Sequence, residues 1–392
     1  MDVSDPAHAQ RAALEALIRR EIDAAGGRLA FDRFMDLALY APGLGYYVAG
    51  APKLGATGDF VTAPEISPLF GRALAVACRE GLRALESSTA NGGDLLEFGA
   101  GSGALAAEIL TALAADGPLP GRYLILEPSP DLAAQQRRTL SERVPELFAR
   151  CHWLERLPAS FQGVILANEV LDAMPVHRFQ IGAHGQVQEI CVGREGERFI
   201  EVLAEPAAPA LRAAVAALHA AGVATQPGYR SEVNLRLAPW VQALSARLAA
   251  GLLLAIDYGY PRAEFYLDER NQGTLMCHSR HRAHSDPYRD LGLQDITAHV
   301  DFSALAAAGH AAGLRLAGYT TQANFLIGCG IDALIAEAGA QDPMAMLALT
   351  AGAKQLLLPS LMGERFQVLG LASGLDDLAL SGFAVRDLRD RL

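Results

Sequence analysis

The stretch LLEFGAGSGAL, Leu95 to Leu105, contains three glycines at alternate positions, Gly99, Gly101 and Gly103. An apolar run precedes them and a helical run follows, which predicts a strand, a tight turn and a helix. Because glycine has no Cβ atom, a ligand can approach such a turn closely, next to the free N–H groups of the helix. The spacing also satisfies the dinucleotide fingerprint G-x-G-x-x-A, and a plain strand-to-helix turn is a further alternative.

The charge near the glycines helps to choose between these ligands. Glu97 stands two residues before Gly99, where its carboxylate would oppose the pyrophosphate of NAD. S-adenosylmethionine has no phosphate and carries an ammonium and a sulfonium group, which an acid near the loop suits. The second predicted strand ends in Glu127, whose carboxylate can accept hydrogen bonds from two ribose hydroxyls of either cofactor. We therefore expect S-adenosylmethionine as the cofactor.

Short apolar strands alternate with helical runs over about residues 91–330, which predicts an α/β fold with a parallel, doubly wound sheet as its core. Residues 1–90 are expected to form a helical N-terminal lid or substrate region. A hairpin-like pair of strands and two helical runs between core strands predict an inserted α+β segment at about 180–250. Residues 331–392 are expected to form a helical tail packed on the core.

The composition limits the classes of function. The 392-residue chain has a formal net charge of −11, which argues against a general nucleic-acid binder. Five scattered cysteines without a CxxC pair indicate reduced thiols rather than a disulfide framework. No apolar run reaches the roughly 18 residues of a membrane span, and the N-terminus lacks the apolar core of a signal peptide. A cytoplasmic protein without a membrane span is therefore expected.

A polar cluster leaves another apolar strand in the stretch LANEVLDAMPV. It places Asn168, Glu169 and Asp172 at the carboxyl edge of the predicted sheet, where open α/β sheets bind their ligands. Helix capping by Asn168 or Asp172 is the alternative explanation. We expect the cluster to line the ligand site.

Seven stretches occur in an order that resembles a known family: GDFVTAPEISPLFG, LLEFGAGSG, LILEPS, ANEVLDAMPVHRF, LLLAIDYG, GTLMCHSRH and HVDF. Together they resemble the MidA-like class I methyltransferases, relatives of the mitochondrial protein arginine methyltransferase that assists assembly of respiratory complex I. The resemblance implies a seven-stranded Rossmann-like class I sheet, S-adenosylmethionine as cofactor and a protein arginine as methyl acceptor. It also implies that GDFVTAPEIS closes over the site and that the cofactor contacts Gly99, Gly101, Gly103, Glu127 and Asn168.

Methyl transfer to arginine favours carboxylates near the cofactor. The guanidinium group is always protonated, and carboxylates can hold it through paired hydrogen bonds and take up the proton released on methylation. Glu169 is the first candidate for this catalytic role, and Asp172 and Glu65 are the next. Asp257, which ends the apolar run LLLAID, could bind the substrate or equally well cap the turn that follows.

The loop after residue 272 contains cysteine and histidine side chains that could bind a metal ion. Cys277, His278, His281 and His284 are close in sequence, but their spacing fits no standard zinc site, so no metal is expected. His278 is expected near the substrate, with a solvated loop as the alternative. Asp59 is expected to orient the methionine end of the cofactor or merely to cap a helix.

Three functions remain open from the sequence. The first is an enzyme that methylates a protein side chain, and the second is an NAD-dependent oxidoreductase, which Glu97 disfavours. The third is an assembly factor that binds S-adenosylmethionine without turnover. The expected partner is a protein substrate, by the resemblance a subunit of respiratory complex I. Apolar faces on the insertion and the tail allow a homodimer, although such stripes usually pack into a core.

Overall fold

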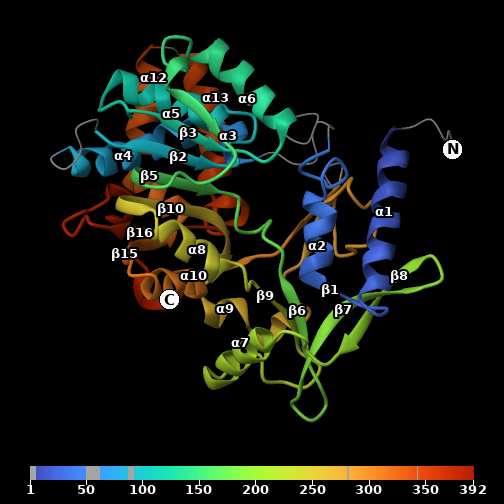
Figure 1. Cartoon of the computed structure of the whole chain (residues 1–392). Helices are drawn as coiled ribbons and strands as arrows, with labels where there is room; N and C mark the ends of the chain where they lie inside the picture. The colour runs from blue at the N-terminus through green and yellow to red at the C-terminus, as the bar shows by residue number, and fades with distance from the viewer. Residues whose placement is uncertain (1–5, 50–61, 87–91, 280–281, 342) are drawn as a thin grey trace.

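The computed structural model describes residues 6–49, 62–86, 92–279, 282–341 and 343–392. Figure 1 shows two parts, a central sheet covered by helices and an accessory lobe beside it that contains α1, α2 and several green strands. The candidate site lies where the two parts meet.

The central sheet has the strand order β15-β16-β10-β5-β2-β3-β4, with the short β14 paired to β10. The strands from β10 to β4 run parallel, as the alternation of strands and helices predicted, whereas β16 is antiparallel to both of its neighbours. The strands are β2 (Asp94–Phe98), β3 (Tyr123–Leu126), β4 (Cys151–Leu154), β5 (Phe161–Asn168), β10 (Leu248–Tyr260), β14 (Val300–Asp301), β15 (Arg315–Thr321) and β16 (Phe366–Ser373).

Helices cover both faces of this sheet because its strands are apolar on both sides. Consecutive residues of one strand, such as Leu252 and Leu253, belong to different buried clusters on the two faces. One face carries α4 (Pro68–Leu85), α5 (Ala104–Ala115), α6 (Pro130–Arg143), α11 (Gln322–Gly328), α12 (Ile331–Gln341) and α13 (Pro343–Leu357). The other face carries α8 (Leu237–Ser245) and α10 (Phe302–Ala311).

The C-terminal segment differs from the expected helical tail. It contributes α12 and α13, but it then enters the central sheet as β16 between β10 and β15. The run FQVLGLAS is buried along almost its whole length. A short apolar run buried on both sides is typical of a central strand, so the prediction of a purely helical tail is wrong for residues 366–373.

Most of the inserted segment and the first two helices form the accessory lobe together, whereas α8 of the insertion and α4 of the N-terminal region pack on the central sheet. The N-terminal β1 pairs with β7, so the first helices pack on the insertion and form no separate unit. The five-stranded sheet of the lobe comprises β1 (Leu29–Ala30), β6 (His177–Ile181), β7 (Val187–Glu195), β8 (Arg198–Ala204) and β9 (Arg230–Val233). Its helices are α1 (Pro6–Ala24), α2 (Phe31–Tyr40) and α7 (Pro209–Ala220), and a second small sheet has β11 (Met276–Ser279), β12 (Arg282–His284) and β13 (Asp295–Thr297).

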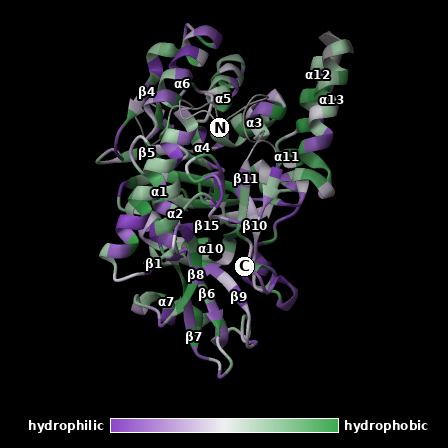
Figure 2. Cartoon of the chain, turned by 90° about the vertical axis from the view of Figure 1, so that its right-hand side faces the viewer, coloured by the Kyte–Doolittle hydropathy of each residue, from purple (hydrophilic) through white to green (hydrophobic). Residues whose placement is uncertain are grey.

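Two surface features bear on partners. Among the helices that the structure describes, none combines the length and hydrophobicity needed to cross a bilayer. The pair of helices α12 and α13 projects at one side of the molecule, and much of its ribbon has the hydrophobic colour (Figure 2). Met344 and Leu347 at the start of α13 are 73% and 66% exposed, far more than a packed helix requires.

Candidate active site

A cavity of about 1320 Å³ lies between the carboxyl edge of the central sheet and the accessory lobe. We call two parts of its lining the glycine-loop half and the acidic half. The glycine-loop half comprises Glu97, Gly99, Gly101, Glu127, Trp153 and Glu155, and the acidic half comprises Tyr40, Tyr47, Glu169, Asp172, Tyr258, His278, Asp295 and His299.

The three glycines adopt left-handed backbone conformations, with φ values of +59° at Gly99, +55° at Gly101 and +85° at Gly103. A Cβ atom at Gly99 would meet nothing within 4 Å, so the main chain there is open to a ligand. Gly103 does not line the cavity; a Cβ atom there would lie 3.2 Å from Cα of Gln136. Its absent side chain therefore serves the packing of α5 against α6 rather than direct contact with a ligand.

The acids of the glycine-loop half are held by neighbouring side chains. The Tyr123 hydroxyl donates to Glu97 at 2.7 Å, and burial raises the pKa of Glu97 to about 7. Glu127 accepts from the backbone N–H of Ser129 at 3.0 Å and from Nε2 of Gln136 at 2.8 Å. The same Gln136 nitrogen donates to the Gly101 carbonyl at 3.0 Å, so one side chain ties Glu127 to the glycine loop.

Sequence reasoning missed the aromatic wall of this half. Trp153 lies at the carboxyl end of β4, and its indole N–H donates to Oε1 of Gln136 at 2.9 Å. The Arg137 guanidinium lies 4.0 Å from the Trp153 ring centroid. The signal was the sequence CHWLE, in which a short strand contains an aromatic residue and is followed by an acid, next to the strand that precedes Glu127.

Glu169, one of the residues of the acidic half, has an unusual backbone conformation. Its φ is +52°, which residues with a Cβ atom seldom adopt. Its carboxylate accepts from Nδ2 of Asn168 at 3.3 Å and faces the backbone N–H of Ala63 at the start of α3 (Ala63–Ile66). Burial and the nearby charge of Asp172 raise the pKa of Glu169 to about 8.

Asp172 lies in the same turn and is 5% exposed. The Tyr258 hydroxyl donates to its Oδ2, and burial raises the pKa of Asp172 to about 6. Its other oxygen, Oδ1, has no hydrogen-bond partner among the described residues. A buried carboxylate oxygen in a cavity wall without a donor is a site for a ligand N–H group.

Two stacked tyrosines and a third buried acid complete this half. The rings of Tyr40 and Tyr47 lie 5.6 Å apart at 20°, and the Tyr47 hydroxyl lies 2.9 and 3.0 Å from the two carboxylate oxygens of Asp295. The Tyr40 hydroxyl donates to the Ala173 carbonyl at 3.0 Å. Burial raises the pKa of both tyrosines, so both stay neutral donors. Tyr40 and Asp295 are distant in sequence and carried no local signal.

Asp257 does not line the cavity, contrary to its expected contact with substrate. It is fully buried, and it accepts from the backbone N–H groups of Val170, Leu171 and Asp172 at 3.2, 2.9 and 3.3 Å. Its Oδ1 also accepts from the backbone N–H of the next residue, Tyr258, at 2.9 Å. The alternative of a backbone cap therefore describes its position better, although the turn that it holds is mainly the distant 170–172 turn.

The remaining predicted residues fall in different places. Glu65 lines the cavity and accepts from the Ser102 hydroxyl of the glycine loop, so it ties α3 to that loop. His278 lines the cavity on β11. Asp59 lies outside the described residues. Within the part of the chain that the structure describes, no group of three or more His, Cys, Asp or Glu side chains is arranged to hold a metal ion.

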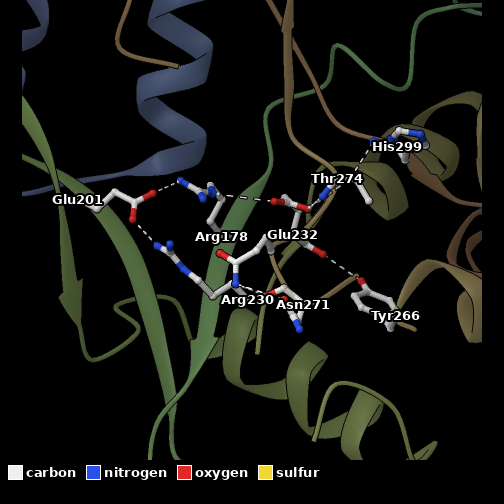
Figure 3. Close-up of polar contacts among 9 residues, drawn as sticks. Arg178, Glu201, Arg230, Glu232, Tyr266, Asn271, Thr274 and His299 are labelled. Atoms are coloured by element: carbon white, nitrogen blue, oxygen red, sulfur yellow. Dashed lines mark hydrogen bonds and ion pairs between the residues drawn. The ribbon is translucent and has the colours of Figure 1, made fainter. Parts of the chain in front are cut away.

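A polar network links the accessory lobe to the cavity at His299, which sequence reasoning also missed (Figure 3). Glu232 on β9 accepts from the backbone N–H of Thr274 at 2.8 Å, and the Thr274 hydroxyl accepts from the backbone N–H of His299 at 3.1 Å. The imidazole stacks on Tyr260 with ring centroids 5.4 Å apart. Burial lowers the pKa of His299 to about 4, so it lines the cavity as a neutral ring.

The residues of the glycine-loop half, together with Asn168 at the end of β5, fit S-adenosylmethionine. Gly99 exposes its main chain to a ligand, and Oδ1 of Asn168 is buried without a hydrogen-bond partner among the described residues. An ammonium group can satisfy that oxygen, and Glu97 supplies a nearby carboxylate. Glu127 stands at the end of the neighbouring strand, where a ribose is commonly held. Fold and site together define an S-adenosylmethionine-dependent methyltransferase.

Comparisons with known proteins identify the family. Residues 73–320 match the model of a family of S-adenosyl-L-methionine-dependent methyltransferases, and the chain belongs to this family. The chain is 31% identical to protein arginine methyltransferase NDUFAF7, mitochondrial, of Danio rerio and 30% identical to that of Homo sapiens. These matches span 88% of this chain and 83% and 80% of the two relatives.

A solved structure is also similar over its whole length. The crystal structure of a Burkholderia thailandensis protein bound to S-adenosyl-homocysteine shares 43% of residues and a TM-score of 0.91, covering 100% of both chains. The cofactor expectation is thus confirmed, and the oxidoreductase alternative is set aside. The expectation of a cytoplasmic protein is wrong by the same comparisons, because the curated relatives are named as mitochondrial proteins.

Proposed function

We propose that the chain transfers a methyl group to an arginine side chain of a partner protein. The observation that carries this proposal is the acidic half of the cavity, where Glu169 and Asp172 lie beside the glycine-loop half. Buried carboxylates next to aromatic rings suit a planar cation, because the rings offer faces and the acids offer paired acceptors. The relatives named as protein arginine methyltransferases support the same acceptor.

The residues of the acidic half have separate tasks in this proposal. Glu169 and Oδ1 of Asp172 accept N–H groups of the guanidinium and fix its plane. Tyr40 and Tyr47 exclude water and hold the wall that contains Asp295. S-adenosylmethionine, when bound, supplies the electrophilic methyl group.

Glu169 is the proposed proton acceptor. The attacking nitrogen forms an N–CH₃ bond as the bond between that methyl group and the cofactor sulfur breaks with its electron pair left on sulfur, and the proton that the nitrogen loses passes to a carboxylate oxygen of Glu169. The raised pKa of about 8 makes that carboxylate a better base than an exposed glutamate. A charged guanidinium beside it favours the ionised form before transfer.

The experiment uses S-adenosylmethionine with a trideuterated methyl group. The chain is incubated with that cofactor and a protein extract, and labelled peptides are located by mass spectrometry. We expect the label on arginine side chains, and none with Gly101→Val. Label on another residue type, on RNA or on small molecules would contradict the proposal. Binding of the cofactor without any transfer would support the assembly-factor alternative.

The partner is proposed by the family resemblance to be a subunit of respiratory complex I. Purified complex I subunits are the first acceptors to test in the same labelling experiment. A labelled arginine in one subunit supports this proposal, and label confined to unrelated proteins contradicts it.

We also propose a homodimer that covers the projecting surface of α13. Met344 and Leu347 are exposed there, and dimer interfaces are rich in such side chains. Sedimentation of Leu347→Glu tests this: a monomer is expected, against a dimer for the unaltered chain and for the control Leu203→Glu, whose exposed leucine lies on β8.

A further inference from the structure

Asp257 is a buried acid with an unusual set of partners. Its side chain is 0% exposed, and among the described residues no arginine, lysine or histidine forms an ion pair with it. Instead, four backbone N–H groups point at its carboxylate: those of Val170, Leu171 and Asp172 at Oδ2 and that of Tyr258 at Oδ1. A carboxylate that accepts several backbone N–H groups is a strong local anchor.

The turn that Asp257 holds cannot satisfy these N–H groups by itself. β5 ends at Asn168, and the following residues form an irregular turn without a helical hydrogen-bond ladder. The N–H groups of three successive residues then point in one direction, away from any carbonyl partner. Because Leu171 and Asp172 are buried, water does not replace such a partner. The Asp257 carboxylate is the acceptor that makes this turn stable.

The same turn has a second feature that needs support. Glu169 directly precedes the three anchored residues and has a left-handed backbone with φ of +52°. Its own N–H donates to the Ile256 carbonyl at 2.9 Å, one residue before Asp257 in β10. Residues with a Cβ atom keep this conformation only where the surroundings hold it. Ile256 and Asp257 of β10 therefore hold the backbone of Glu169 and of the three residues that follow it.

We propose that Asp257 is a positioning residue, which holds Glu169 and Asp172 in the acidic half through the backbone of residues 170–172. The inference rests on the proposed function, in which those two acids bind the guanidinium. Asp257 itself lies outside the cavity lining, so a molecule bound in the cavity would contact the turn and not Asp257. Its removal should thus release the turn without altering the glycine loop.

The experiment separates positioning from general stabilisation. Asp257→Asn keeps one acceptor oxygen, whereas Asp257→Ala keeps none. We expect kcat for arginine methylation to fall about 10-fold for the Asn variant and at least about 100-fold for the Ala variant. The affinity for S-adenosylmethionine, measured by calorimetry, should stay within about 3-fold of the unaltered chain, because Gly99 and Gly101 are untouched. The matched control is Asp301→Asn, a buried acid that caps α10 by accepting from Ala304 at 3.0 Å and does not line the cavity.

Hydrogen exchange of the backbone amides gives a readout that does not depend on activity. In Asp257→Ala, exchange should rise in the peptide that contains residues 170–172, with no change in the peptide that contains Gly99 and Gly101. Unchanged exchange in that turn, or kcat within twofold of the unaltered chain, would overturn the proposal. Parallel loss of cofactor affinity would also overturn it, since Asp257 would then support the whole sheet. If the unaltered chain methylates no arginine, the proposed function fails, and the exchange measurement still decides the role of Asp257.

Discussion

The two halves of the cavity are assembled in different ways. The glycine-loop half comes from one continuous part of the chain, the ends of β2, β3 and β4 and the residues just after them. The acidic half combines α2, the turn after β5, the end of β10 and the small sheet of the accessory lobe. The first half is therefore a local device for holding a cofactor, and the second depends on how distant segments pack. Variants that separate the two halves test this distinction.

The largest effect is expected at the glycine loop. Gly101→Val places a β-branched residue at φ of +55°, where its Cβ atom is strongly disfavoured. We expect the affinity for S-adenosylmethionine to fall by at least about 100-fold in calorimetry, with loss of all methyl transfer. Gly313→Val is the control, because Gly313 has φ of +80° and open space around it but lies far from the cavity in sequence and does not line it. Equal loss of affinity in both variants would show that backbone strain alone explains the result.

An intermediate effect is expected for Asp172→Asn. This change removes a charged acceptor of the acidic half and weakens its hydrogen bond from Tyr258. We expect kcat/KM for an arginine acceptor to fall roughly 10- to 100-fold, while cofactor affinity stays close to that of the unaltered chain. Asp94→Asn is the control, since Asp94 pairs with Arg122 at the opposite end of β2. If both variants lose acceptor turnover equally, the acidic half has no special part in the reaction.

The next effect is the pH dependence of KM for the acceptor, which we assign to the acidic half. A carboxyl group must be ionised to bind a guanidinium, and the raised pKa values are about 8 for Glu169 and about 6 for Asp172. Since both groups lose their protons as the pH rises through these values, KM for the acceptor should fall by on the order of 100-fold between pH 6 and pH 8.5, most of it from Glu169. Glu169→Gln should flatten this dependence. A KM that is constant over this range in the unaltered chain would contradict the assignment.

The smallest effect is expected for Tyr47→Phe. The change removes the hydroxyl that contacts both oxygens of Asp295 but keeps the stacked ring. KM for the acceptor should rise about 5-fold while kcat stays nearly constant, as expected for the loss of one hydrogen bond. Tyr288→Phe serves for comparison, because the buried Tyr288 hydroxyl has no hydrogen-bond partner among the described residues. An equal change in both variants would remove Asp295 from the account.

The contrast also explains which parts could be predicted from the sequence. The glycine turn, Glu97 and Glu127 belong to adjacent strands, so local patterns place them at one edge of a parallel sheet. Asn168 and Glu169 were predicted for the same reason, because they follow an apolar strand directly.

The remaining parts depend on contacts between distant segments. Tyr40 and Asp295 meet at the cavity only because α2 packs on β13, and nothing in either stretch indicates this. Asp257 lies near the carboxyl end of β10, much as Glu127 follows β3, yet its side chain accepts from the backbone of the turn after β5 and does not face the cavity. Strand β16 was missed because helices α11, α12 and α13 separate it from its partner β15, and its other partner β10 lies still earlier in the chain.

The central claim is that one cavity binds the cofactor and the acceptor with separate sets of residues. Its most direct test is to measure, on one preparation of Glu169→Gln, the affinity for S-adenosylmethionine and the rate of trideuteromethyl transfer to arginine. We predict an affinity within about 3-fold of the unaltered chain and a transfer rate lower by at least about 100-fold. Transfer at the unaltered rate, or an equal loss of cofactor affinity, would contradict the claim.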